Sequence, residues 1–142
     1  MSASSSRAIP RGAIFLFYLA GGILHFAAPD ALVSIMPEFV PWPRQVVLGT
    51  GIWEILGAFA FLHPSTRRAA GIAMAVYAIV VFPANIKHAL SAVHVEGLPS
   101  GWWYHGPRLA LQSVIVWWAL YCGEVISWPF ARQQDRPDSE QP

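Results

Sequence analysis

Residues 71–90 read GIAMAVYAIVVFPANIKHAL, and this stretch decides the fold class of the chain. No charged side chain occurs between residues 71 and 84. A helix of a soluble bundle needs a polar face that recurs with the helical period, whereas a membrane span does not. The stretch therefore favours a membrane-spanning helix over a helix of a soluble bundle.

The composition of the chain points the same way. Of its 142 residues, 55% are hydrophobic and 12% are charged, whereas soluble domains carry roughly 25% charged residues. The formal net charge is +1 and the basic residues are scattered, so we expect no nucleic-acid partner. The single cysteine, Cys122, excludes an intrachain disulfide and is expected to be a buried packing residue.

Four apolar stretches have the length that a membrane helix needs. They are residues 12–28, 45–62, 69–90 and 109–128, each close to the roughly 20 residues that cross a hydrocarbon core. We predict an all-α fold, an integral membrane four-helix bundle of up-down-up-down topology that packs through small residues such as Gly22, Gly51 and Gly71. A cleaved signal peptide is the alternative for residues 12–28, because Arg7 and Arg11 precede that stretch.

The basic residues predict the orientation. Six arginines fall on one side of the predicted membrane: Arg7, Arg11, Arg67, Arg68, Arg132 and Arg136. The positive-inside rule then places both termini in the cytoplasm, with residues 1–11 as a polar N-terminus and 129–142 as a disordered tail. On the outer side, residues 29–44 are expected to form a short interfacial helix and a bent lid, because they contain several prolines. Trp42, Trp102 and Trp103 suit an aromatic belt at that interface.

Six polar residues lie in the outer half of the predicted spans and come from all four of them. They are His25, Glu54, Asn85, His88, Arg108 and Gln112. Ionisable groups in lipid cost roughly 2.5–3.5 kcal/mol each on insertion scales, so they normally face the interior of a bundle and pair there. We therefore predict an outward-facing polar pocket, with Arg108 as the partner of Glu54 and with a backbone carbonyl near Ile79 freed by Pro83.

Structural roles are the alternative for each of these residues. The imidazoles of His25 and His88 could hydrogen-bond the loops, the amides of Asn85 and Gln112 could join helices, and Arg108 could anchor the interface. The Lys87 side chain is expected to extend to the membrane surface. Three further histidines are expected to be solvated in loops: His63, His94 and His105.

Several segments together resemble a known family. They read AGGILHFAAPD, IMPEFVPWP, GIWEILGAFAFL followed by TRR, VFPANIKHAL and PRLALQSVIVWWAL, and they cover roughly residues 18–121. This series resembles the DoxX-like small membrane proteins. The resemblance implies a multi-pass protein of the bacterial inner membrane whose polar pattern is carried by the six residues above. It also implies a link to thiosulfate and quinol oxidation or to oxidative-stress complexes, without assigning a reaction.

Several functions follow as hypotheses. The first is a small subunit or scaffold of a membrane redox or oxidative-stress system, whose partners are the lipid bilayer and a redox protein or further copies of the chain. The second is a membrane-embedded oxidoreductase or quinone-like binding site, in which His25, His88 and Arg108 hold the ligand and Glu54 relays a proton. A haem or metal between His25 and His88 is disfavoured because the chain lacks CxxCH, HExxH and a histidine pair four residues apart. A transporter is disfavoured because no inverted repeat is visible.

Overall fold

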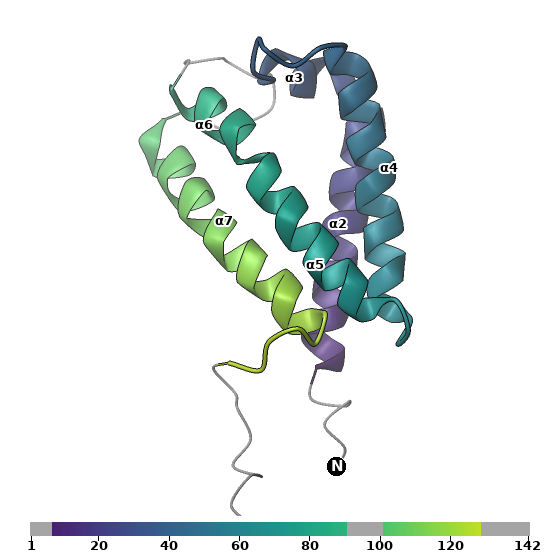
Figure 1. Ribbon diagram of the computed structural model, residues 1–142. Coiled ribbons are helices and arrows are strands. Elements are labelled where there is room, and N and C mark those ends of the chain that lie inside the picture. Colours follow the sequence, from purple (N-terminus) through teal and green to yellow (C-terminus); the bar gives the residue numbers. More distant parts are fainter. Residues whose placement is uncertain (1–6, 91–100, 129–142) are drawn as a thin grey trace, which may run out of the picture.

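The computed structural model describes residues 7–90 and 101–128 (Figure 1). The predicted tail 129–142, residues 1–6 of the predicted N-terminus and His94 lie outside this part of the chain. The regular elements are α2 (Ala8–Ala27), α3 (Pro29–Ser34), α4 (Pro43–Leu62), α5 (Arg67–Val80), α6 (Phe82–Leu90) and α7 (Trp102–Cys122). The described residues contain helices and no strand, which confirms the prediction of an all-α fold.

Three stretches of the described chain are long and apolar enough to cross a membrane. They are Ala8–Ala27, Pro43–Leu62 and Arg67–Leu90, the last of which contains α5 and α6. Large apolar side chains such as Leu16, Leu56 and Val80 are exposed on them, whereas Glu54 and His88 are buried. Apolar side chains thus face outward and polar ones inward, the reverse of the pattern of a soluble bundle. Helix α7 is not among the three.

The helices pack in two antiparallel pairs. Helix α2 packs most extensively against α4, and α5 packs most extensively against α7, while α4 and α5 join the pairs. A Cβ atom on Gly22 would lie 2.8 Å from the Gly51 carbonyl oxygen, so the backbones of α2 and α4 approach as closely as glycine allows. The predicted packing through small residues is confirmed for this pair.

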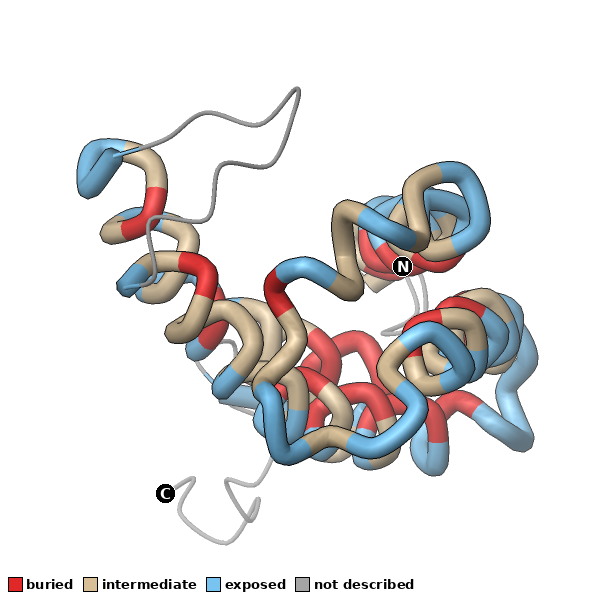
Figure 2. Tube along the Cα trace, turned by 90° about the horizontal axis from the view of Figure 1, so that it is seen from above, coloured by how far each residue is buried: buried red, intermediate tan, exposed pale blue. Residues whose placement is uncertain are grey.

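The apolar core lies at the end of the molecule where α2 and α5 begin. Ile14, Phe61, Met74 and Cys122 are all inaccessible to solvent there. The position of Cys122 agrees with its predicted role as a packing residue. In Figure 1 the pair of α2 and α4 and the pair of α6 and α7 diverge from this end toward the end that carries α3. Figure 2, which looks along the molecule, shows that the buried residues lie mainly where the helices run side by side.

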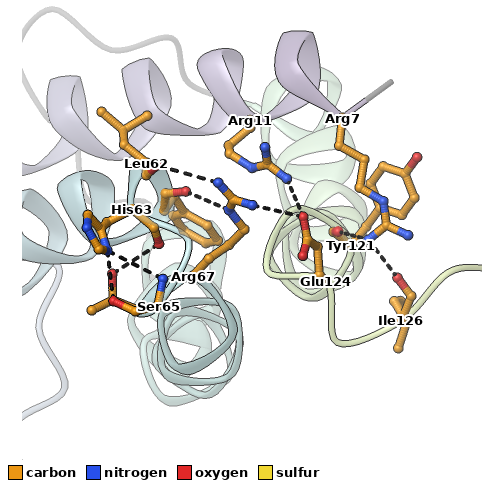
Figure 3. Close-up of polar contacts among 11 residues, drawn as sticks. Arg7, Arg11, Leu62, His63, Ser65, Arg67, Tyr121, Glu124 and Ile126 are labelled. Atoms are coloured by element: carbon orange, nitrogen blue, oxygen red, sulfur yellow. Dashed lines mark hydrogen bonds and ion pairs between the residues drawn. The ribbon is translucent and has the colours of Figure 1, made fainter. Parts of the chain in front are cut away.

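The carboxylate of Glu124 links three helices at the core end (Figure 3). Glu124 Oε1, just beyond α7, accepts hydrogen bonds from Arg11 Nη2 of α2 at 2.8 Å and from Arg67 Nη1 of α5 at 3.0 Å. The Arg7 guanidinium lies over the Tyr121 ring and donates to the Tyr121 carbonyl at 2.8 Å. These contacts hold α2, α5 and the end of α7 together at the core end, whereas the helix pairs separate toward the other end.

Three of the predicted helical stretches differ from the observed helices. The helix predicted for 12–28 begins earlier, at Ala8, so residues 8–11 of the predicted polar N-terminus are helical. The stretch 69–90 is not one helix, because α5 ends at Val80 and α6 begins at Phe82. Pro83 lacks the N–H that a continuous helix would need at this point, so the chain breaks there. The helix predicted for 109–128 begins earlier and ends earlier, at Trp102 and Cys122. Gly101, at φ 108°, sets its start, and Pro107 lies inside the helix instead of ending the preceding loop.

Candidate functional site

A cavity of about 510 Å³ lies between the diverging helix pairs. Every described helix contributes to its wall, and so does the segment that joins α3 to α4. Most of the wall is apolar. The polar side chains on it are His25, Thr50, Glu54, Tyr77, Asn85, Arg108, Gln112 and the hydroxyl of Tyr18. Five of the six residues predicted to form a polar pocket therefore meet here, and the sixth, His88, lies behind Arg108.

One polar wall is built around Glu54 of α4. The Tyr77 hydroxyl of α5 donates a hydrogen bond of 2.7 Å to Glu54 Oε1. His25 Nε2 of α2 lies 3.8 Å from the same oxygen. The other carboxyl oxygen rests against the backbone of Gly21, where an added Cβ would lie 2.5 Å from Oε2. Three helices thus meet at this carboxyl group, and only a residue without a side chain fits beside it.

The tautomer of His25 follows from its partners. Its Nδ1 lies 2.7 Å from the Val47 carbonyl oxygen, which can only accept, so Nδ1 carries a proton. The Thr50 hydroxyl lies 3.0 Å from the same nitrogen and donates to the same carbonyl. Nε2 is consequently the ring nitrogen that faces Glu54. At 3.8 Å the two groups are too far apart for a direct hydrogen bond but close enough for one ligand oxygen to contact both.

The second polar wall is a chain of hydrogen bonds that runs in one direction from Arg108. A guanidinium has only donors, so Arg108 donates to His88 Nδ1 and to Asn85 Oδ1, each at 2.6 Å. Asn85 Nδ2 then donates to Gln112 Oε1 at 3.1 Å. Gln112 Nε2 finally donates to the backbone carbonyl of Ala78, near the helix break. The sequence predicted a backbone acceptor around Ile79, freed by Pro83; the carbonyl that accepts from Gln112 is that of the neighbouring residue, Ala78.

The predicted pairing of Glu54 with Arg108 is wrong. Glu54 contacts Tyr77 and His25, whereas Arg108 contacts His88 and Asn85. The two charged groups sit on opposite helix pairs, which diverge at this end of the molecule (Figure 1). Each group therefore takes partners from neighbouring helices instead of crossing the cavity.

His105 was expected in a solvated loop, but it is buried in the first turns of α7. Its ring lies edge-on to the ring of His88, with 4.9 Å between the centroids. The imidazoles of His25 and His88 have separate partners, so the structure does not bring these two together as the haem or metal hypothesis required. Among the described residues no cluster of histidine, cysteine, aspartate or glutamate could hold a metal ion. His63 is exposed beside Ser65 in the turn between α4 and α5, as predicted.

The segment between α2 and α4 contributes one side of the cavity. It contains the short helix α3, as predicted for residues 29–44, followed by turns that place Met36 and Val40 on the cavity wall. Lys87 Nζ donates to the Met36 carbonyl at 2.6 Å, so this side chain reaches inward to the segment instead of extending to the surface.

Three polar residues of the cavity wall escaped prediction: Tyr18, Thr50 and Tyr77. All three carry hydroxyl groups within apolar helical stretches, where tyrosine and threonine are normally packing residues. A usable signal was present, because Thr50 and Glu54 are four residues apart and therefore share a helix face. Tyr77 gave no such signal, because its contact with Glu54 depends on how α5 crosses α4.

A model of a protein family matches residues 14–123, a range that includes the whole cavity wall; the family is described as a domain of unknown function (DUF8561). Comparison with curated proteins and with solved structures finds no match.

Proposed function

We propose that this chain, which belongs to the DUF8561 family of unknown function, is a multi-pass membrane protein that binds a small amphipathic molecule. The cavity carries this proposal. Its volume of about 510 Å³ and its apolar walls with a few polar groups are the features of small-molecule sites, which span roughly 300–1,000 Å³.

Unsatisfied polar atoms on the cavity wall support binding. The Tyr18 hydroxyl and Glu54 Oε2 are buried without a hydrogen-bond partner in the described chain. Buried polar atoms of folded proteins nearly always find a partner, either in the protein or in a bound molecule or water. A bound molecule or water would satisfy such groups, and a largely apolar ligand would fill the apolar remainder of the cavity.

The proposed setting is the bacterial inner membrane, which the chain would cross four times. The crossings are α2, α4, the pair α5 and α6 taken together, and α7. The apolar outer faces of these helices, including Leu111 and Val114 on α7, support this arrangement. Arg11 and Arg67 stand at the end opposite the cavity, so the positive-inside rule supports cytoplasmic termini and a cavity toward the outer surface. The exposed side chains of Trp42 and Trp103, near the cavity end, suit the outer interface.

A quinone site is the second candidate, and the spacing of His25 and Glu54 favours it. A quinone oxygen would fit between His25 Nε2 and Glu54 Oε1, which are 3.8 Å apart. When an external electron donor reduces the quinone, that oxygen would take a proton from Glu54 in its protonated form or from His25 in its doubly protonated form. The resemblance to DoxX-like proteins supports a place in a redox or oxidative-stress system. A scaffold role without a ligand stays a prediction from the sequence, because such a role would not require the cavity.

The proposal is tested on protein purified in a neutral detergent. Organic extraction followed by mass spectrometry should release a small amphipathic molecule in stoichiometric amount. The variant Ala84→Trp places a large ring on the cavity wall and should abolish retention. Ala69→Trp is the matched control, because Ala69 is exposed and lies outside the wall. Equal retention by the wild type and by Ala84→Trp would contradict the proposal.

The quinone candidate needs a separate measurement. We expect Glu54→Gln, which keeps the size of the side chain but removes the ionisable group, to weaken binding of decylubiquinone or to block its reduction. If quinone binding and turnover are the same in both proteins, or if the wild type binds no quinone, the second candidate is wrong while the cavity proposal stands.

A further inference from the structure

Arg108 carries a positive charge on the cavity wall that no described carboxylate balances. The arginine ion pairs in the described chain join Arg11 and Arg67 to Glu124 and Arg44 to Asp30. The two hydrogen-bond partners of Arg108, His88 and Asn85, are both neutral. His88 must be neutral because its Nδ1 accepts from the guanidinium, which can only donate. The Tyr104 ring, 6.0 Å away, adds a weak cation–π contact and no countercharge.

The guanidinium retains unused donors. It has five N–H groups, and the two hydrogen bonds engage one on each terminal nitrogen. Arg108 is partly buried and lines the cavity. Because arginine stays protonated in proteins, the charge persists in this largely apolar setting. An anion with two oxygens would meet such a group in the paired geometry that arginine prefers.

The remainder of the cavity indicates where the other end of such a ligand lies. The wall opposite Arg108 carries the carboxyl group of Glu54, which offers an acid no countercharge. Between the two polar walls the lining is apolar and includes Phe17, Val47 and Ile115. An acidic group at Arg108 would therefore leave an apolar chain to lie along this lining.

We propose that the ligand is a single-chain amphiphile with a carboxylate headgroup, similar to a fatty acid, and that Arg108 binds the carboxylate. This inference rests on the proposed function, since it names the ligand class of the same cavity. The directed chain through Asn85 and Gln112 holds the guanidinium in place, and His88 supports it from behind.

The test compares two probes of equal chain length, palmitate and hexadecanol, in equilibrium binding to protein in nanodiscs of phosphatidylcholine. We expect the wild type to bind palmitate about tenfold or more tightly than the alcohol. Arg108→Gln should remove this preference by weakening palmitate binding to the level of the alcohol. Arg108→Lys should keep part of it, because the charge remains while the paired geometry is lost.

Arg44→Gln is the control for general surface charge. Arg44 lies on the same end of the molecule but is exposed and paired with Asp30, so its loss should not change palmitate binding. Should Arg108→Gln unfold, Arg108→Lys decides the question: a preference for the acid equal to that of the wild type would overturn the assignment of the carboxylate to Arg108.

Other outcomes separate the two proposals. Equal binding of acid and alcohol that Ala84→Trp abolishes would overturn the carboxylate inference and leave the cavity proposal intact. Palmitate binding that is insensitive to Ala84→Trp would place the acid outside the cavity and would overturn the inference too. If neither probe binds, and extraction of the purified protein yields no ligand, both proposals are wrong.

Discussion

Gln112 shows how one amide can fix the conformation around it. Its oxygen accepts from Asn85, and its nitrogen donates to the Ala78 carbonyl, so the amide orientation is determined at both ends. The side chain is buried, with 8% of the residue exposed. Because α7 carries Gln112 while Asn85 and Ala78 belong to α6 and α5, this residue joins α7 to both halves of the broken helix.

Replacing Gln112 should therefore destabilise the fold. Gln112→Leu has a similar volume but leaves Asn85 Nδ2 and the Ala78 carbonyl without a partner. Each buried group left unsatisfied costs about 1–3 kcal/mol, so we expect the free energy of unfolding to fall by at least about 1 kcal/mol. Thermal or denaturant unfolding in detergent measures the change. Gln45→Leu, at an exposed position of α4, should stay within about 0.5 kcal/mol of the wild type. A neutral Gln112→Leu would show that water replaces these hydrogen bonds.

The pairing of α2 with α4 depends on close backbone contact. Neither helix has a side chain at Gly22 or Gly51, and the polar wall around Glu54 lies just beside this contact. Because His25 is one turn from Gly22, the separation of the two helices also sets the distance between His25 and Glu54.

A methyl group at Gly22 should push the two helices apart. In Gly22→Ala the new Cβ would lie 2.8 Å from the Gly51 carbonyl oxygen, which is backbone and cannot rotate away. Overpacking of this kind costs about 1–3 kcal/mol, and we expect the melting temperature to fall accordingly. Gly12→Ala is the control in the same helix, since a Cβ there meets nothing within 4 Å. It should be neutral or stabilise by up to about 1 kcal/mol, because alanine is the better helix former. Equal effects of the two substitutions would refute the close-contact interpretation.

The molecule as a whole is held together at one end and open at the other. Glu124 and its two arginines join α2, α5 and α7 at the core end, and the cavity occupies the end where the helix pairs diverge (Figures 1 and 3). The Glu124 contacts hold the helices in their relative positions, although the cavity, and not a continuous apolar core, lies between them at the other end.

Removing the Glu124 carboxylate should destabilise the whole assembly. In Glu124→Gln the side chains of Arg11 and Arg67, which are 8% and 11% exposed, lose their shared countercharge. Breaking a fully buried pair costs roughly 3–5 kcal/mol, but the Glu124 side chain is 45% exposed, so we expect about 1–3 kcal/mol. Unfolding measurements at low and high salt would show this loss. Asp30→Asn, which removes the carboxylate of the exposed pair with Arg44, should cost no more than about 1 kcal/mol. Comparable losses in the two variants would argue against the role of Glu124 as a clamp.

The sequence alone determined the helical fold, the apolar stretches and the end of the molecule at which the polar residues gather. These properties are local: they depend on hydropathy, on helix length and on the rise per residue, which places His25, Asn85 and Arg108 at one level. For the same reason Asn85 and His88, three residues apart, were expected on one face, and both contact Arg108.

Only the tertiary structure decided which polar groups pair. Glu54 meets Tyr77 and His25, and Arg108 is left without a described carboxylate, because the helix pairs diverge where these residues lie. The angle between helices depends on side-chain packing along their full length, at contacts such as that of Gly22 with Gly51, and no local pattern of residues encodes it. The same divergence opens the cavity, so the feature that carries the proposed function arises from the packing of the helices and not from any one of them.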